Sequence, residues 1–123
     1  MKKKIICFDL DGVICKTKGI DYKNSVPIKK NISVINLLKK NGFIIKIFTA
    51  RFMGRSKENV YLAKKRGFKL TLSQLKKWGI DYDFLIMGKP TYDLFIDDKN
   101  LSFDNNWSKE LLKELKLIRK NNY

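Results

Sequence analysis

Histidine is absent from this 123-residue chain, and cysteine occurs only twice. The lack of imidazole excludes the usual Ser-His-Asp and Cys-His catalytic arrangements and every histidine metal site. Cys7 and Cys15 are too few for a structural zinc site or a disulfide framework. We therefore expect both cysteines to pack as small apolar side chains in a reducing, cytoplasmic compartment.

Acidic residues are also scarce: 12 Asp and Glu oppose 27 Lys and Arg, which gives a net charge of +15. Such a charge attracts anions, including phosphates, nucleic acid and anionic lipid. However, 23 of the 27 basic residues are lysines scattered along the chain, whereas proteins that read bases rely on arginine. We interpret most of this charge as solvated surface and do not expect nucleic acid as the partner.

Long hydrophobic runs are missing as well. The opening MKKKIICF resembles the start of a signal peptide, but Asp9 and Asp11 end its apolar segment too early. No later run approaches the length that spans a membrane. We expect a cytoplasmic protein without a membrane partner, folded as a single domain over residues 1–123.

Four short apolar runs predict buried strands, at residues 4–10, 43–48, 83–88 and 92–97. Between or after them, helical patterns cover residues 31–41, 56–66, 71–78 and 107–120, the first capped by Asn31 and the third by a Thr71–Gln74 capping box. Residues 15–30 lack regular apolar spacing and predict an extended flap. Strands that alternate with helices predict an α/β fold with a parallel sheet covered on both faces.

Polar side chains follow every predicted strand, where a parallel sheet gathers its ligands. They are Asp9 and Asp11, then Thr49, then Lys89, and finally Asp97 and Asp98. Carboxylates without imidazole form a hard oxygen site of the kind that Mg²⁺ prefers. A hydroxyl and free backbone amides suit phosphoryl oxygens, and a lysine offsets the negative charge that builds during transfer.

The segments FDLDGVI, IFTAR, GKP and FIDDK, in that order, resemble the four signature motifs of the haloacid dehalogenase (HAD) superfamily of phosphatases. The resemblance spans residues 5–99, and its DxDG motif is the most specific part. It implies a Rossmann-like, HAD-type three-layer sandwich with a central parallel sheet and no cap domain. The small size and the GKP…DDK spacing further resemble capless members of capsule and lipopolysaccharide biosynthesis.

The resemblance also implies a role for each motif residue at the first two strand ends. Asp9 is the nucleophile that becomes an aspartyl-phosphate, and it ligates the metal. Asp11 is the general acid and then the general base, and its backbone carbonyl ligates Mg²⁺. Thr49 and the amide of Ala50 hold the phosphoryl oxygens.

At the other two strand ends, Lys89 neutralises the nucleophile and the transferring group. Asp98 is the first choice as a magnesium ligand, with Asp97 as its partner or support. The adjacent Asp97–Asp98 pair departs from the common arrangement, in which two acids lie several residues apart. Which of the two touches the metal therefore stays open.

Arg51 and Arg55 follow Thr49 closely and are candidates for contact with a second anionic or hydroxyl part of the substrate. Pairing with Glu58 or exposure to solvent explains them equally well. Tyr22 is interpreted as a packing residue rather than as a substrate platform.

Together these features predict a magnesium-dependent phosphomonoester hydrolase that acts on a small phosphorylated metabolite. A sugar, polyol or amino-alcohol phosphate of surface polysaccharide biosynthesis is the family-based expectation. With no cap, specificity falls to the 15–26 flap, the loop after Thr49, or a neighbouring subunit of a homo-oligomer. Two alternatives stay open: a nucleic-acid terminal phosphatase, and a non-enzymatic receiver-like module phosphorylated on aspartate.

Overall fold

The computed structural model describes residues 5–101, 104 and 106–114. The chain divides into two compact units, Met1–Thr91 and Tyr92–Tyr123. The first unit contains the strands β1 (Ile5–Asp9), β2 (Cys15–Lys16), β3 (Val26–Pro27), β4 (Ile44–Thr49) and β5 (Phe84–Met87), and the helices α1 (Lys29–Lys40) and α2 (Val60–Lys77). Two short 3₁₀ helices, Tyr22–Asn24 and Gly54–Ser56, lie in its loops.

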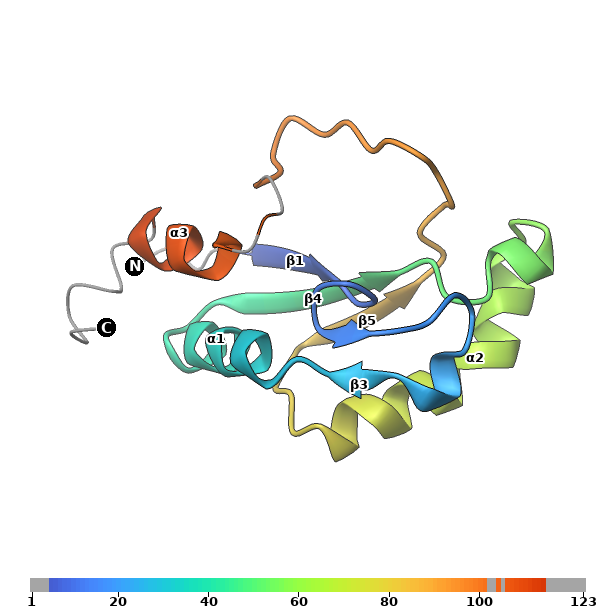
Figure 1. The fold of residues 1–123 in the computed structure, drawn as a ribbon, viewed down its shortest axis with the longest axis horizontal. Coiled ribbons are helices and arrows are strands. Elements are labelled where there is room, and N and C mark those ends of the chain that lie inside the picture. Colours follow the sequence, from blue (N-terminus) through green and yellow to red (C-terminus); the bar gives the residue numbers. More distant parts are fainter. Residues whose placement is uncertain (1–4, 102–103, 105, 115–123) are drawn as a thin grey trace. The chain divides into compact units, whose positions relative to one another are not determined.

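The core of the first unit is a parallel sheet in the order β1-β4-β5 (Figure 1). This arrangement confirms the predicted α/β, Rossmann-like fold with a central parallel sheet. Burial alternates along each strand: Phe8, Ile47 and Met87 are buried, whereas Ile5, Phe84 and Ile86 point to the exposed face. Helix α1 lies in the connection from β1 to β4, and α2 lies in the connection from β4 to β5. Both connections run in the same direction across the sheet, so right-handed crossovers place both helices on the buried face.

Helix α1 begins two residues earlier than predicted, and Asn31 does not cap it. The residue before the helix is Ile28, and no side chain caps this end. Instead, the Asn31 side chain is buried and donates a hydrogen bond to the carbonyl of Val13, 2.8 Å away. The tertiary contact outweighs the local cap because it also satisfies a carbonyl of the loop after β1.

Two predicted helices, 56–66 and 71–78, are one continuous helix, α2, capped by Asn59. The first predicted range ends just before Gly67, a residue type that often ends helices, but Gly67 lies inside α2. A Cβ at Gly67 would clash with the Phe52 ring, so the glycine gives that ring room to pack against the helix. Thr71 is no capping residue either: its hydroxyl donates to the Gly67 carbonyl, 2.8 Å away.

The flap after β1 is a short hairpin of β2 and β3 rather than a wholly irregular segment. Gly12 opens it with φ = +94°, a conformation that favours glycine and turns the chain sharply after Asp11. Three successive amides, from Val13 to Cys15, then donate to the carbonyl of Leu10. The turn thereby fixes the backbone around Asp11, two residues after the end of β1.

In the second unit, residues 92–97 form no strand, contrary to the prediction. Leu94 and Ile96 are 78% and 88% exposed. An apolar run with strand propensity becomes a strand only when it pairs with a neighbour, and no ladder includes this run. Helix α3 (Trp107–Glu114) confirms the start of the predicted tail helix; residues 115–120 lie outside the described part. No described helix is long and apolar enough to cross a membrane.

Candidate phosphoryl-transfer site

Asp9 and Lys89 meet at the carboxyl edge of the sheet. The Nζ atom of Lys89 lies 3.5 Å from Oδ2 of Asp9. Asp9 ends β1 and Lys89 follows β5, two strands that are separated by β4. The Lys89 side chain is 11% exposed, so its ammonium is directed toward the sheet edge rather than into solvent. Two of the predicted strand ends therefore deliver opposite charges to one place.

The environment of the Asp9 carboxylate suits a nucleophile. Its side chain is 37% exposed, and its Oδ1 accepts a hydrogen bond from the Leu10 amide, 2.9 Å away. Burial raises the pKa of the Asp9 carboxyl, while Lys89 and the Leu10 amide lower it and therefore limit the rise. Partial desolvation makes a carboxylate a stronger nucleophile, and the ammonium keeps it ionised.

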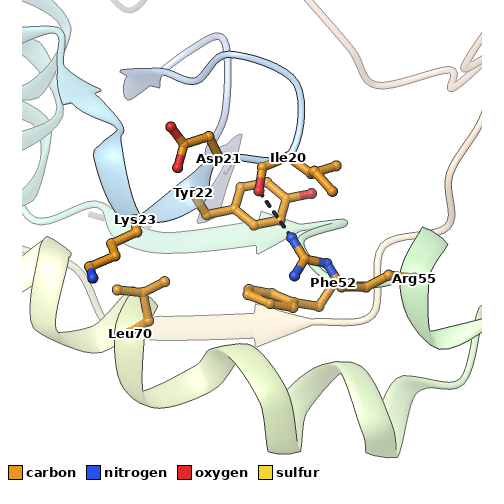
Figure 2. A pocket seen from close by; sticks show the side chains of 7 residues that line it. All are labelled: Ile20, Asp21, Tyr22, Lys23, Phe52, Arg55 and Leu70. Atoms are coloured by element: carbon orange, nitrogen blue, oxygen red, sulfur yellow. Dashed lines mark hydrogen bonds between the residues drawn. The ribbon is translucent and has the colours of Figure 1, made fainter.

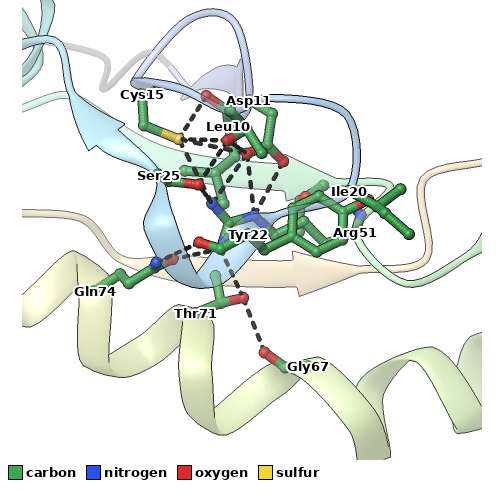
Figure 3. A network of polar contacts seen from close by, with 12 residues as sticks. Leu10, Asp11, Cys15, Ile20, Tyr22, Ser25, Arg51, Gly67, Thr71 and Gln74 are labelled. Carbon is green, nitrogen blue, oxygen red and sulfur yellow. Dashed lines mark hydrogen bonds and ion pairs between the residues drawn. The ribbon is translucent and has the colours of Figure 1, made fainter.

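Asp11 lies at the centre of a polar network that links β1, the flap and α2 (Figure 3). The Arg51 guanidinium donates from Nε to both carboxylate oxygens, at 3.2 and 3.0 Å, and from Nη2 to Oδ1 at 2.9 Å. Oδ1 also accepts from the Thr17 hydroxyl, 2.6 Å away, and from the Cys15 thiol. Oδ1 is thus heavily engaged, which makes Oδ2 the oxygen better placed to exchange a proton.

Arg51 is buried, with 1% of its surface exposed. The sequence had suggested contact with substrate, pairing with Glu58 or exposure to solvent, and none of these predicts a buried side chain. Its guanidinium donates to Gln74 and Thr71 of α2 and to Ser25 of the flap. A buried guanidinium is stable only when its donors are paired, and here the partners come from three separate segments. Its position supports a role in holding Asp11 rather than in contacting substrate, and Glu58 instead accepts from the Thr91 amide.

Thr49 ends β4 and is fully buried. Its hydroxyl accepts a hydrogen bond from the Arg51 amide, 3.1 Å away, and its carbonyl accepts one from the Lys89 amide. Ala50 follows at the surface of the turn and is half-buried. The structure therefore joins the ends of β4 and β5 through backbone hydrogen bonds, and the Thr49 hydroxyl proton can still be donated.

Arg55 is the one of the two predicted substrate arginines that lies at the surface. Its guanidinium stands 4.4 Å from the Phe52 ring and donates to the Ile20 carbonyl, 3.0 Å away (Figure 2). Tyr22 contacts Phe52 as predicted for a packing residue, with ring centroids 5.0 Å apart. These side chains border a pocket of about 200 Å³ between the flap and α2.

Asp97 and Asp98 belong to the second unit, where both are exposed. Asp97 accepts a hydrogen bond from the Lys99 amide, 2.9 Å away. Within the described residues, no three acidic or cysteine side chains gather into a metal-binding group. The first unit alone supplies the carboxylate of Asp9 and the backbone carbonyl of Asp11, oxygen donors that fit Mg²⁺ but need further ligands to complete its shell.

Thr17, Ser25 and Gln74 also belong to the Asp11–Arg51 network, and the sequence analysis did not predict a role for any of them. All three lie in segments interpreted as flap or helix cap, and their hydrogen bonds join positions far apart in the chain. One signal was present: polar Thr71 and Gln74 stand three residues apart, on one face of what proved to be a continuous helix.

Solved structures of other proteins share the fold of this chain. A crystal structure of a protein from Vibrio cholerae matches with a TM-score of 0.75 and 26% identity, over 91% of this chain and 98% of that one. A chain of the Pnkp1/Rnl/Hen1 complex matches with a TM-score of 0.51 and 28% identity, and this chain spans 34% of its length. No family model and no curated protein matches the sequence.

A D,D-heptose 1,7-bisphosphate phosphatase from B. bronchiseptica, complexed with magnesium and phosphate, shares 13% identity at a TM-score of 0.49. The two higher matches support the α/β, Rossmann-like fold of this chain.

Proposed function

We propose that this protein is a magnesium-dependent phosphomonoester hydrolase that works through an aspartyl-phosphate on Asp9. The observation that carries the proposal is the 3.5 Å approach of Lys89 to Asp9 from a strand that is not its neighbour. A lysine with no role at this site would extend into solvent, rather than past β4 to the half-buried carboxylate of Asp9. A nucleophile that must face a dianionic phosphoryl group does need a fixed cation beside it.

In the proposed reaction, a carboxylate oxygen of Asp9 attacks phosphorus, and the bond from phosphorus to the alcohol oxygen breaks. Asp11, through Oδ2, gives a proton to the leaving oxygen. In the second half, Asp11 takes a proton from water as the water attacks the acyl-phosphate, which returns Asp9 and releases phosphate. The hydroxyl of Thr49 and the amide of Ala50 hold the phosphoryl oxygens throughout.

Asp9, the carbonyl of Asp11 and Asp98, with Asp97 beside it, are the residues proposed to hold the magnesium ion. When bound, such an ion screens the charge of the phosphoryl oxygens and orients them toward the nucleophile. The proposed substrate is a small phosphorylated metabolite, with a sugar, polyol or amino-alcohol phosphate of surface polysaccharide biosynthesis as the first candidates.

The test is phosphate release from a panel of phosphorylated metabolites, with Mg²⁺ and with EDTA. We expect release that requires the metal and is abolished by Asp9→Asn. Equal rates in EDTA would remove the metal from the proposal, and an Asp9→Asn variant that retains most of the rate would remove the nucleophile.

A nucleic-acid terminal phosphatase is the second candidate. The net charge of +15 favours it, because such a charge attracts nucleic acid. It predicts binding to 3′- or 5′-phosphorylated oligonucleotides that weakens steeply as salt rises. A protein that releases phosphate from metabolites but shows no salt-dependent oligonucleotide binding excludes this candidate.

A further inference from the structure

The pocket beside Arg55 has walls from three separate segments. Ile20, Tyr22 and Lys23 come from the flap, Phe52 and Arg55 from the loop after β4, and Leu70 from α2 (Figure 2). The loop is held in place, because Arg66 of α2 donates to the Arg55 carbonyl at 2.9 Å. The flap is held as well, because Gln74 donates to the Tyr22 carbonyl at 2.6 Å.

The loop that carries Arg55 holds its shape at a conformational cost. Phe52, Lys57 and Glu58 all have positive φ, at 67°, 52° and 61°. Side chains other than glycine adopt this region rarely, and such strain persists where the surroundings impose it, often at functional sites. For Phe52, the surroundings are Gly67 on one side and the Tyr22 ring on the other.

Arg51 contacts both Tyr22 of the pocket and Asp11 of the proposed reaction site. The Arg51 guanidinium is 5.0 Å from the Tyr22 ring, and the Arg55 guanidinium is 5.7 Å from the same ring. Because Arg51 also holds Asp11, only two side chains separate the proposed general acid from Arg55. The side chains of Arg51 and Tyr22 thus connect the pocket to the Asp11 carboxylate through direct contacts.

The charges of the pocket select its ligand. Arg55 and Lys23 are exposed cations, and neither takes part in a salt bridge among the described residues. The one acid of the lining, Asp21, has its two carboxylate oxygens engaged by the Asn24 side chain, at 3.1 and 3.0 Å. A guanidinium and an ammonium over a partly apolar floor fit a dianionic phosphate better than a neutral polyol.

We propose that this pocket binds a second phosphate group of the substrate, attached to the alcohol that leaves when the first phosphate is transferred. This inference rests on the proposed function, because it makes Arg55 the specificity residue of the same site. The second phosphate can belong to a small bisphosphorylated metabolite or to a nucleotide, and the recognition chemistry is the same for both. No bond to this second phosphate forms or breaks.

The experiment measures binding instead of turnover, so that it stands apart from the hydrolase proposal. In the Asp9→Asn protein with Mg²⁺, dissociation constants are compared for fructose 1,6-bisphosphate and fructose 6-phosphate, and for adenosine 3′,5′-bisphosphate and adenosine 3′-monophosphate. We expect at least one bisphosphate to bind about tenfold more tightly than its monophosphate, as a charge-assisted contact provides. The pair that shows the preference identifies the source of the phosphate.

Adding Arg55→Gln must bring this ratio close to one, whereas Lys40→Gln, which removes an exposed charge at the far end of α1, must leave it unchanged. Lys23→Gln serves if Arg55→Gln does not fold, and it must lower the ratio about threefold. The inference is overturned if neither bisphosphate is preferred, or if the preference survives both pocket variants. A wild-type protein that releases no phosphate refutes the hydrolase proposal but leaves these binding ratios interpretable.

Discussion

Nη2 of Arg51 lies 2.9 Å from Oδ1 of Asp11, across 40 positions of sequence. The pair joins the loop after β1 to the loop after β4, and its further contacts extend to the flap and to α2. Because Asp11 is proposed to move protons at the site, this relationship links the stability of the first unit to its chemistry. Substitution of Arg51 should therefore affect both properties.

Arg51→Met is expected to lower the free energy of unfolding by about 3 kcal/mol, the low end for breaking a buried ion pair, because Asp11 is 27% exposed. Urea denaturation followed by circular dichroism measures the change. Lys77→Met, at an exposed position near the end of α2, is the matched control and should change stability by less than about 0.5 kcal/mol. Equal effects of the two substitutions would show that the network contributes little.

Gly67→Ala tests the packing of Phe52 against α2. An alanine inside a helix normally stabilises it by about 1 kcal/mol, but here the added methyl group meets the Phe52 ring, and overpacking costs about 1–3 kcal/mol. We expect a net loss of stability in the wild-type background. In a Phe52→Ala background, the sign should reverse and Gly67→Ala should stabilise. A stabilising Gly67→Ala in both backgrounds would contradict the packing.

Lys89→Met is expected to slow phosphate release by at least about 100-fold, because the cation beside the nucleophile is lost. Lys89 lowers the pKa of the Asp9 carboxyl, so its removal should move that pKa upward. The acid limb of the pH–rate profile, measured at saturating Mg²⁺, should then shift to higher pH. Lys89→Arg keeps the charge and should preserve the position of that limb, and a shift in both variants would argue against the charge as the cause.

Asp98→Asn and Asp97→Asn separate the two candidate ligands of the second unit. If Asp98 ligates the metal, its substitution should raise the Mg²⁺ concentration for half-maximal activity by about tenfold or more, and Asp97→Asn should have a smaller effect. Titration of phosphate release with MgCl₂ gives both values. A larger effect at Asp97 would exchange the two roles, and no effect at either would exclude this pair from the site.

Cys15 should be unreactive despite its place in the network. Burial raises the pKa of the Cys15 thiol to about 11, and the carboxylate of Asp11 adds to the rise. At pH 8, only about one thiol in a thousand is then ionised. In a Cys7→Ser protein, alkylation by iodoacetamide should be slow at pH 8 and become fast after denaturation in urea. Rapid alkylation of the native protein would contradict this environment.

The sequence predicted the strands of the parallel sheet and the pairing of Asp9 with Lys89, because local patterns determine both. Each end of the three strands in the parallel sheet lies within one residue of its predicted position, since short apolar runs bounded by glycine or aspartate indicate strands. The meeting of Asp9 with Lys89 follows from the rule that ligand-binding groups gather at the carboxyl ends of strands.

The failures share one cause, which is that contacts between distant segments override local signals. Gly67 stops no helix because a ring from another loop needs its space. Asn31 caps no helix because it binds the Val13 carbonyl. Arg51 is buried because three distant segments, rather than any neighbour in sequence, supply its partners, and no single-sequence pattern encodes that arrangement.

The most direct test of the central claim is chemical trapping of the phosphorylated residue. The protein is mixed with Mg²⁺ and a substrate from the metabolite panel, quenched in acid, reduced with borohydride and digested for mass spectrometry. An acyl-phosphate on aspartate is reduced to homoserine, so we predict homoserine at position 9 in the wild-type protein and at no position in Asp9→Asn. Homoserine at another aspartate, or phosphate release without any reduced residue, would contradict the proposal that Asp9 is the nucleophile.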